Sequence, residues 1–172
     1  LLAIGDSVML GAKDYLRRGL PGIQVDAQVG RQGRDAIKLI RQMKTEGKLP
    51  DSILIHMGTN GYLPADHFKK LILELADRKQ VLLVNIHAGR RWEADNNRLL
   101  SDIQGMGLKN IRLIDWARVA KDHDEYFVAD GIHLTGKGIL AYAGVIRDAM
   151  GINTPILSSA QLAAETKAAR KK

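Results

Sequence analysis

This chain contains a serine, an aspartate and a histidine whose chemistry and spacing would allow them to carry out acyl transfer together. Ser7 follows the apolar run "LLAIG", and Asp130 precedes His133 by three residues in the loop "VADGIH". An aspartate at that separation can accept a hydrogen bond from Nδ1–H of the histidine and leave Nε2 free to take the serine proton. A serine needs such a base because its neutral hydroxyl is a weak nucleophile. The alternative role for Ser7 is to cap the helix that follows.

Attack by Ser7 on an ester carbonyl forms an oxyanion, which needs hydrogen-bond donors that are already in place. The sequence offers the backbone N–H of Ser7, a backbone N–H in the stretch from Gly30 to Gly33, and the side-chain amide of Asn60. Removal of one such donor typically raises the barrier by about 3–4 kcal/mol.

Short apolar runs alternate with amphipathic segments along the chain, which predicts repeated βαβ units. We therefore expect an α/β fold, a three-layer α/β/α sandwich around a five-stranded parallel sheet of the flavodoxin-like kind. The expected strands are 1–5, 23–29, 52–58, 80–87 and 110–115, and the expected helices are about 9–19, 33–46, 64–78, 93–106 and 137–150. His56 falls inside the third strand and is expected in the core. Residues 1–150 would form one catalytic domain, and 151–172 a short helix or a disordered basic tail.

The residues that follow the predicted strands are the place to look for a site, because ligands of such sheets bind beyond the carboxyl ends of the strands. Ser7 follows the first strand, "VGRQG" (29–33) the second, "HMGTNG" (56–61) the third, and "YFVADGIHLTGKG" (126–138) comes after the fifth. We therefore expect the hydroxyl, amide, carboxylate and imidazole to lie along one rim of the sheet.

The composition excludes several other kinds of site. The 172 residues include no cysteine, which rules out disulfides and thiolate metal sites. No cluster of histidines and carboxylates has metal-ligand spacing, so no metal or other cofactor is expected. A formal net charge of +7 indicates an anionic neighbour such as nucleic acid, a lipid surface or a cell-wall polymer. Nucleic acid is not expected as a partner, because the chain lacks a phosphate-binding loop and an aromatic-rich basic patch.

Four of these motifs together resemble the SGNH (GDSL-like) hydrolases. They are "GDSV", a glycine after the second strand, "GTNG" and "DGIHLT", in that order over about residues 1–150. The resemblance implies that Ser7 is the nucleophile, His133 the base and Asp130 its orienting partner, with Asn60 as an oxyanion donor. For the glycine of the oxyanion hole, Gly33 fits the common esterase spacing, whereas Gly30 fits the subgroup described next and is preferred.

The motifs "IGDSVMLGA", "VDAQVGRQ", "IHMGTNG" and "FVADGIHLTGKG" are similar to one subgroup, the extracytoplasmic domains attached to bacterial membrane acyltransferases. Notable members are the peptidoglycan O-acetyltransferases. The resemblance implies transfer of an acetyl group to the C6 hydroxyl of muramic acid through an acetyl-serine intermediate. It also implies an acetyl donor and a cell-wall glycan acceptor as partners. A membrane acyltransferase domain is expected before residue 1, and a soluble, membrane-tethered position outside the cytoplasm is expected for the domain.

Acceptor residues are expected near the same rim. Candidates are Arg31, Tyr62 and the loop "GRRWEADNN", in which Trp92 could stack on a sugar face and Arg90 or Arg91 could meet a carboxylate. The alternative is a packed tryptophan at a helix start flanked by surface arginines.

Two other functions remain open from the sequence. In the first, water instead of a sugar attacks the acyl-enzyme, which makes the protein a carbohydrate or peptidoglycan O-acetylesterase. In the second, the chain is a non-catalytic basic module that binds a polymer, and Ser7 only caps a helix.

Overall fold

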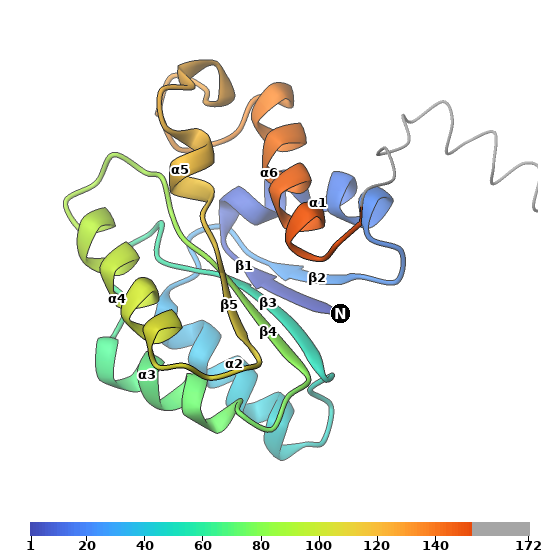
Figure 1. Ribbon diagram of the computed structural model, residues 1–172. Helices are drawn as coiled ribbons and strands as arrows, with labels where there is room; N and C mark the ends of the chain where they lie inside the picture. The colour runs from blue at the N-terminus through green and yellow to red at the C-terminus, as the bar shows by residue number, and fades with distance from the viewer. Residues whose placement is uncertain (153–172) are drawn as a thin grey trace, which may run out of the picture.

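A five-stranded parallel sheet forms the centre of the molecule, with helices on both of its faces (Figure 1). The computed structural model describes residues 1–152. The strands are β1 (Leu2–Gly5), β2 (Gln24–Ala27), β3 (Ser52–His56), β4 (Gln80–Val84) and β5 (Ile111–Ile114). Their order across the sheet is β2-β1-β3-β4-β5. This arrangement confirms the predicted three-layer α/β/α fold.

Six α-helices and one short 3-10 helix connect or follow the strands in the described residues. They are α1 (Ser7–Gly19), α2 (Gly33–Thr45), α3 (Ala65–Glu74), α4 (Glu93–Gly105), α5 (Trp116–Ala120), η1 (Asp124–Tyr126) and α6 (Gly136–Ala149). Helices α2, α3 and α4 pack on one face of the sheet, and α1, α5 and α6 pack on the other (Figure 1).

The strands are apolar along most of their length because each face of the sheet contributes to a separate core. Along β3, Ile53 and Ile55 belong to the core under α2, α3 and α4, while Leu54 between them belongs to the core under α1 and α6. Successive side chains of a strand point to opposite faces, so both sets must be apolar. Burial of each such side chain contributes about 1.5–3 kcal/mol.

The carboxyl ends of the strands are aligned, and this alignment places the loops of the site together. Gly5 pairs with Ala27 on one side and with His56 on the other. His56 pairs in turn with Val84, and Val84 with Ile114. Because these are the last residues of their strands, the chain leaves the sheet at one common edge after each of them.

Two short elements were not among the predicted ones. The segment after β5 was expected to be a loop, but it contains α5 and η1. α5 has five residues and buries Trp116, a length at which no helical periodicity can be recognised in the sequence. The predicted helix or tail at 151–172 falls, from residue 153 onward, outside the described residues. None of the helices between residues 1 and 152 is long and apolar enough to cross a membrane.

Candidate active site

Ser7, His133 and Asp130 form a continuous hydrogen-bonded series at the carboxyl edge of the sheet. Nε2 of His133 lies 3.0 Å from Oγ of Ser7, although the two residues are 126 positions apart in the sequence. Nδ1 of His133 lies 2.6 Å from Oδ2 of Asp130. The three side chains that were predicted to meet are therefore within hydrogen-bond distance. This arrangement allows Nε2 to accept the serine proton while the carboxylate holds Nδ1–H.

Ser7 is the first residue of α1, and the neighbouring Asp6 supplies the helix cap. Oδ1 of Asp6 accepts a hydrogen bond from the backbone N–H of Val8 at 3.1 Å. The capping role considered for Ser7 thus belongs to Asp6, and the serine hydroxyl is left to pair with His133. The N-terminal end of α1 also carries a partial positive charge, which favours negative charge that develops beside Ser7.

Asp130 is oriented by the backbone of its own turn. Its Oδ1 accepts hydrogen bonds from the N–H groups of Ile132 at 2.8 Å and of His133 at 2.9 Å. Gly131, which follows Asp130 in this turn, has a φ of +70°, a conformation that side-chain-bearing residues rarely adopt. The hydrogen bond to the His133 side chain, followed by the two backbone hydrogen bonds, lowers the pKa of Asp130 to about 2. The carboxylate therefore stays ionised at any pH where the protein is expected to work.

The loop that carries His133 is tied to the start of α6. Its ends are joined by an isolated antiparallel bridge between Phe127 and Leu134. Thr135 caps α6 by accepting from the N–H of Gly138 at 3.3 Å, and its hydroxyl donates to the carbonyl of Glu125 at 2.7 Å. These contacts fix the position of the loop that carries His133 relative to α6.

The loops after β2 and β3 are hydrogen-bonded to each other and carry the predicted oxyanion donors. Nε2 of Gln32 donates to the carbonyl of Gly30 at 3.1 Å and to that of Asn60 at 3.3 Å. Nδ2 of Asn60 donates to the carbonyl of Arg31 at 3.4 Å. Asn60 is thus held beside the Gly30 loop, as a shared oxyanion hole requires.

The two glycines considered for the oxyanion hole have different surroundings. Gly30 has a φ of +70°, and a Cβ built there would meet nothing within 4 Å. Gly33 begins α2, and a Cβ there would lie 2.7 Å from a methyl carbon of Leu63. Close packing against Leu63 therefore requires glycine at position 33, whereas the positive φ favours glycine at position 30. The preference for Gly30 stays a prediction.

Asn96 on α4 supports the Asn60 loop, and the sequence analysis did not identify it. Its side chain is buried and donates to the carbonyls of Gly58 at 3.0 Å and Gly61 at 2.9 Å. Its Oδ1 accepts from the N–H of Leu63 at 2.8 Å. A polar residue at a position of α4 that faces the core was the available signal, because a buried amide needs partners.

Two of the predicted acceptor residues lie next to each other beside these loops. The rings of Tyr62 and Trp92 have centroids 6.1 Å apart and are tilted by 59°. Nε1 of Trp92 donates to the carbonyl of Thr59 at 3.2 Å, which fixes the indole to the loop that carries Asn60. Tyr62 and Arg91 are exposed. The structure thus places an exposed tyrosine next to a half-buried tryptophan, and an exposed guanidinium in the loop before α4.

Arg31, also predicted as an acceptor residue, is engaged by the protein itself. Its guanidinium donates to the carboxylate of Asp26 at 2.6 Å, to the carbonyl of Asp26 at 2.6 Å, and to the carbonyl of Gly5 at 3.3 Å. Its side chain is only 8% exposed. These bonds join the loop after β2 to the end of β1. The arginine therefore holds this loop in place.

A buried polar cluster of Asp6, His56 and Tyr142 lies in the core next to Ser7. Nδ1 of His56 lies 2.5 Å from the hydroxyl of Tyr142, and all three residues are at most 1% exposed. His56 is therefore a core residue, as predicted. Burial lowers the pKa of His56, although the Asp6 carboxylate opposes this effect, and burial raises the pKa of Tyr142 well above its usual value. The cluster lies between the end of β1, the end of β3 and α6, and therefore supports the elements on either side of the hydrogen-bonded series.

The described residues contain no group of three or more histidine or acidic side chains arranged to hold a metal ion. The site as it stands offers a hydroxyl, an imidazole, a carboxylate and amide donors. Those groups are sufficient for acyl transfer through a serine ester.

Comparison with known proteins identifies relatives but no matching family model. Peptidoglycan O-acetyltransferase OatA of Listeria monocytogenes is 35% identical over 149 residues. YrhL of Bacillus subtilis, which is provisionally named a peptidoglycan O-acetyltransferase, is 37% identical over 150 residues. Each match covers 87% of this chain, but only 24% of OatA and 23% of YrhL. The chain therefore spans about a quarter of the length of these curated relatives.

Solved structures give a consistent picture. The C-terminal catalytic domain of Streptococcus pneumoniae OatA, solved with a methylsulfonyl adduct, has a TM-score of 0.77 and 26% identity. That comparison covers 92% of this chain and 97% of the domain. A GDSL-like lipase of Bacteroides thetaiotaomicron has a TM-score of 0.65 at 18% identity, over 87% of this chain and 86% of the lipase. The second likeness shows a common fold alone.

Proposed function

This chain is homologous to peptidoglycan O-acetyltransferases and has the fold of the SGNH hydrolases, and we propose that it is a serine-dependent O-acetyltransferase domain. The proposed reaction moves an acetyl group from a donor to the C6 hydroxyl of muramic acid in a cell-wall glycan. The observation that carries the proposal is the hydrogen-bonded series of Ser7, His133 and Asp130.

In the first half-reaction, Oγ of Ser7 attacks the carbonyl carbon of the acetyl donor while Nε2 of His133 takes the serine proton. The carbonyl oxygen becomes an oxyanion, which accepts hydrogen bonds from the N–H groups of Ser7 and Gly30 and from the amide of Asn60. The intermediate then expels the leaving group of the donor, which receives the proton from His133. Acetyl-Ser7 remains.

In the second half-reaction, a sugar hydroxyl gives its proton to Nε2 of His133 and attacks the acetyl carbonyl of acetyl-Ser7. The bond between the carbonyl carbon and Oγ breaks, and Oγ regains a proton from Nε2. Water in place of the sugar would release acetate, so the outcome depends on how well the acceptor is positioned and water excluded.

Tyr62 and Trp92 are proposed to supply that positioning. Aromatic faces present large, rigid, partly polar surfaces, and these two are next to each other on loops tied to Asn60. Arg91 is proposed to meet a carboxylate of the acceptor, because a guanidinium can bind a carboxylate through two parallel hydrogen bonds.

The relatives are about four times as long as the matched region, so a further domain is part of the proposal. We propose that the full protein carries a membrane acyltransferase domain that precedes residue 1 and supplies acetyl groups. The present domain would then work outside the cytoplasm, tethered to the membrane. Its net charge of +7 would favour a position beside anionic wall polymers.

The test uses para-nitrophenyl acetate as donor and a chito-oligosaccharide or muroglycan fragment as acceptor, with products identified by mass spectrometry. The expected result is an acetylated glycan that requires both the protein and the acceptor. Free acetate alone, at every acceptor concentration, would instead assign the protein as an O-acetylesterase. If the donor is not turned over under any condition, the remaining function is that of a non-catalytic module that binds a polymer.

A further inference from the structure

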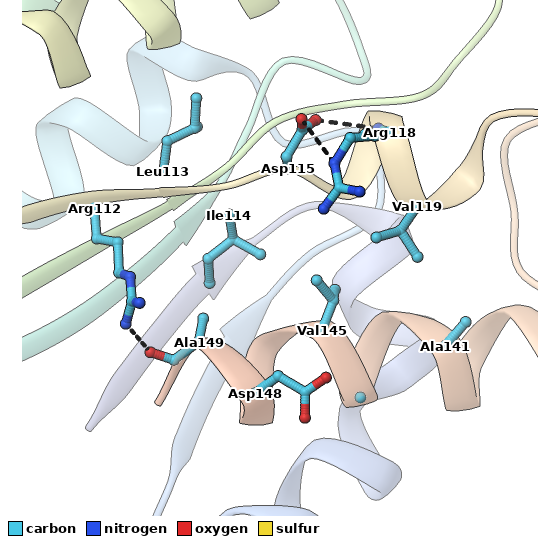
Figure 2. Close-up of a pocket in the computed structure, with 11 residues that line it drawn as sticks. Arg112, Leu113, Ile114, Asp115, Arg118, Val119, Ala141, Val145, Asp148 and Ala149 are labelled. Atoms are coloured by element: carbon cyan, nitrogen blue, oxygen red, sulfur yellow. Dashed lines mark hydrogen bonds and ion pairs between the residues drawn. The ribbon is translucent and has the colours of Figure 1, made fainter. Parts of the chain in front are cut away.

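Two surface hollows that do not include Ser7, His133 or Asp130 differ in whether their positive side chains are balanced by carboxylates. The first, of about 630 Å³, lies between β5, α5 and α6 (Figure 2). Its arginines bond to the protein: Arg118 pairs with Asp115 at 3.6 Å, and Arg112 donates to the carbonyl of Ala149. Its lining also includes the carboxylates of Asp115 and Asp148, which balance the two guanidiniums, so this hollow presents little net positive charge.

The second hollow is a groove of about 510 Å³ between α2 and α3, and it is basic. Arg34, Lys38 and Arg41 line it from α2, at positions that share one face of a helix. His67 lines it from α3. Ile37 and Pro64 provide its apolar surface, and the carboxylates nearest in sequence do not line it.

The positive charge of this groove is uncompensated at one end only. Arg41 is bound by both oxygens of Glu74, at 2.8 and 2.9 Å, which neutralises the far end. Arg34 and Lys38 are exposed, and they form no ion pair or side-chain hydrogen bond with any of residues 1–152. The end with free charge is the one nearer to the loops that carry Gly30 and Asn60, since Arg34 directly follows Gly33 at the start of α2.

The groove also adjoins the candidate oxyanion loops through its walls. A Cβ at Gly33 would lie 2.7 Å from Leu63 and 3.1 Å from Pro64, so α2 and the segment before α3 are in close contact at this point. Gln32 connects the same two segments through its hydrogen bond to the carbonyl of Asn60. The Gly33 and Pro64 end of the groove therefore lies beside the loops that carry Gly30 and Asn60, the predicted oxyanion donors.

We propose that this groove binds a peptide carboxylate of the acceptor glycan, with Arg34 and Lys38 as the residues that hold it. The inference rests on the proposed function, because peptidoglycan is a glycan whose short peptides carry free carboxylates. A guanidinium and an ammonium bind a carboxylate through charge-assisted hydrogen bonds. Ile37 and Pro64 offer apolar contact to the methylene groups next to it. A pocket of this size accommodates a short peptide portion rather than a single ion.

The experiment measures binding to the Ser7→Ala protein by titration calorimetry, so that no turnover occurs. The probes are a disaccharide-peptide fragment of peptidoglycan and the same fragment with its carboxylates amidated. The carboxylate fragment should bind about tenfold more tightly than the amidated one, and added salt should reduce that difference. Replacing Arg34 and Lys38 together by glutamine should remove the preference and leave the weak binding of the amidated fragment.

The matched control replaces two other exposed cations, Arg17 on α1 and Lys109 before β5, by glutamine, which changes the net charge equally. This control should keep the tenfold preference. The proposal is overturned if the fragments bind equally, or if both double variants lose the preference alike, which would indicate general electrostatic attraction. Hydrolysis of para-nitrophenyl acetate by the wild-type protein is measured separately. Its absence would reject the proposed function without altering the binding result.

Discussion

Oδ2 of Asp130 lies 2.6 Å from Nδ1 of His133, while Oδ1 of the same carboxylate accepts two backbone N–H groups. One carboxylate thus fixes both the turn and the imidazole that faces Ser7. Replacement by asparagine retains the size of the side chain but allows the amide to donate to Nδ1, which favours the wrong tautomer. We predict that Asp130→Asn lowers kcat for para-nitrophenyl acetate about 10³-fold with little change in KM. A kcat within a few-fold of the wild type would remove Asp130 from the proposed mechanism.

The low pKa of Asp130 has a consequence for stability. Its pKa is about 2 in the folded protein and near 3.8 without these hydrogen bonds, so it stabilises the fold above about pH 4 and ceases to do so as the pH falls to 2. The melting temperature of wild type should therefore exceed that of Asp130→Asn at pH 5, and the two should converge towards pH 2. A difference that grows on acidification would contradict this assignment.

His56 predicts a pH dependence in a different range. Burial lowers its pKa below the usual 6.5, so below that pH the unfolded chain binds a proton that the folded protein rejects. Titration of His56 then leaves the free energy of unfolding unchanged above pH 6.5 and lowers it as the pH drops below 6.5. The slope approaches about 1.4 kcal/mol per pH unit for one proton. Denaturant unfolding between pH 5 and 8 measures this slope for wild type and for His56→Gln, and the variant should lack it. Equal slopes in both proteins would show that another group is responsible.

Asn96 should matter for both stability and activity, because it holds the loop that contains Asn60. Asn96→Ala leaves three backbone groups without their buried partner, which costs about 2–4 kcal/mol of unfolding free energy. It should also lower kcat at least tenfold under conditions where the variant is folded, by displacing Asn60.

Asn97→Ala is the matched control for that variant. Asn97 bonds to the N–H of Ile86 at 2.9 Å and to its carbonyl at 2.8 Å, on a different loop. It should reduce stability while leaving kcat close to wild type. An equal effect of Asn96→Ala and Asn97→Ala on kcat would contradict the positioning role proposed for Asn96.

Replacement of Trp92 should impair transfer to the glycan more than attack on the acetyl donor. Trp92→Ala removes the ring that lies beside Tyr62 but none of the groups placed at Ser7. We predict a rise in KM for the glycan acceptor of about tenfold or more, with a smaller effect on hydrolysis of para-nitrophenyl acetate. Because Trp92 also bonds to the carbonyl of Thr59, Trp92→Phe serves to separate the loss of that hydrogen bond from the loss of the ring. An equal loss of both activities, or of neither, would count against an acceptor role.

Much of the fold was predictable because its signals are local and repeated. The runs around Ile53–Ile55 have apolar side chains on both faces of the strand, as a covered parallel sheet demands. The sheet rule then placed Ser7 and the His133 loop at one edge, and the motif resemblance to peptidoglycan O-acetyltransferases is confirmed by the homology. What escaped prediction depends on contacts between distant residues. The pairing of Arg31 with Asp26 leaves no periodic trace in the sequence. The core-facing position of Asn96 on α4 signals a buried amide, but periodicity does not identify the Asn60 loop as its partner.

The most direct measurement is the turnover of para-nitrophenyl acetate by wild type and by Ser7→Ala, together with the mass of each intact protein during the reaction. We predict that the wild type accumulates one acetyl group on Ser7, and that the variant carries none and turns over at least about 10³-fold more slowly. Wild-type turnover by Ser7→Ala, or an acetyl group carried on another residue during steady state, would contradict the role assigned to this serine.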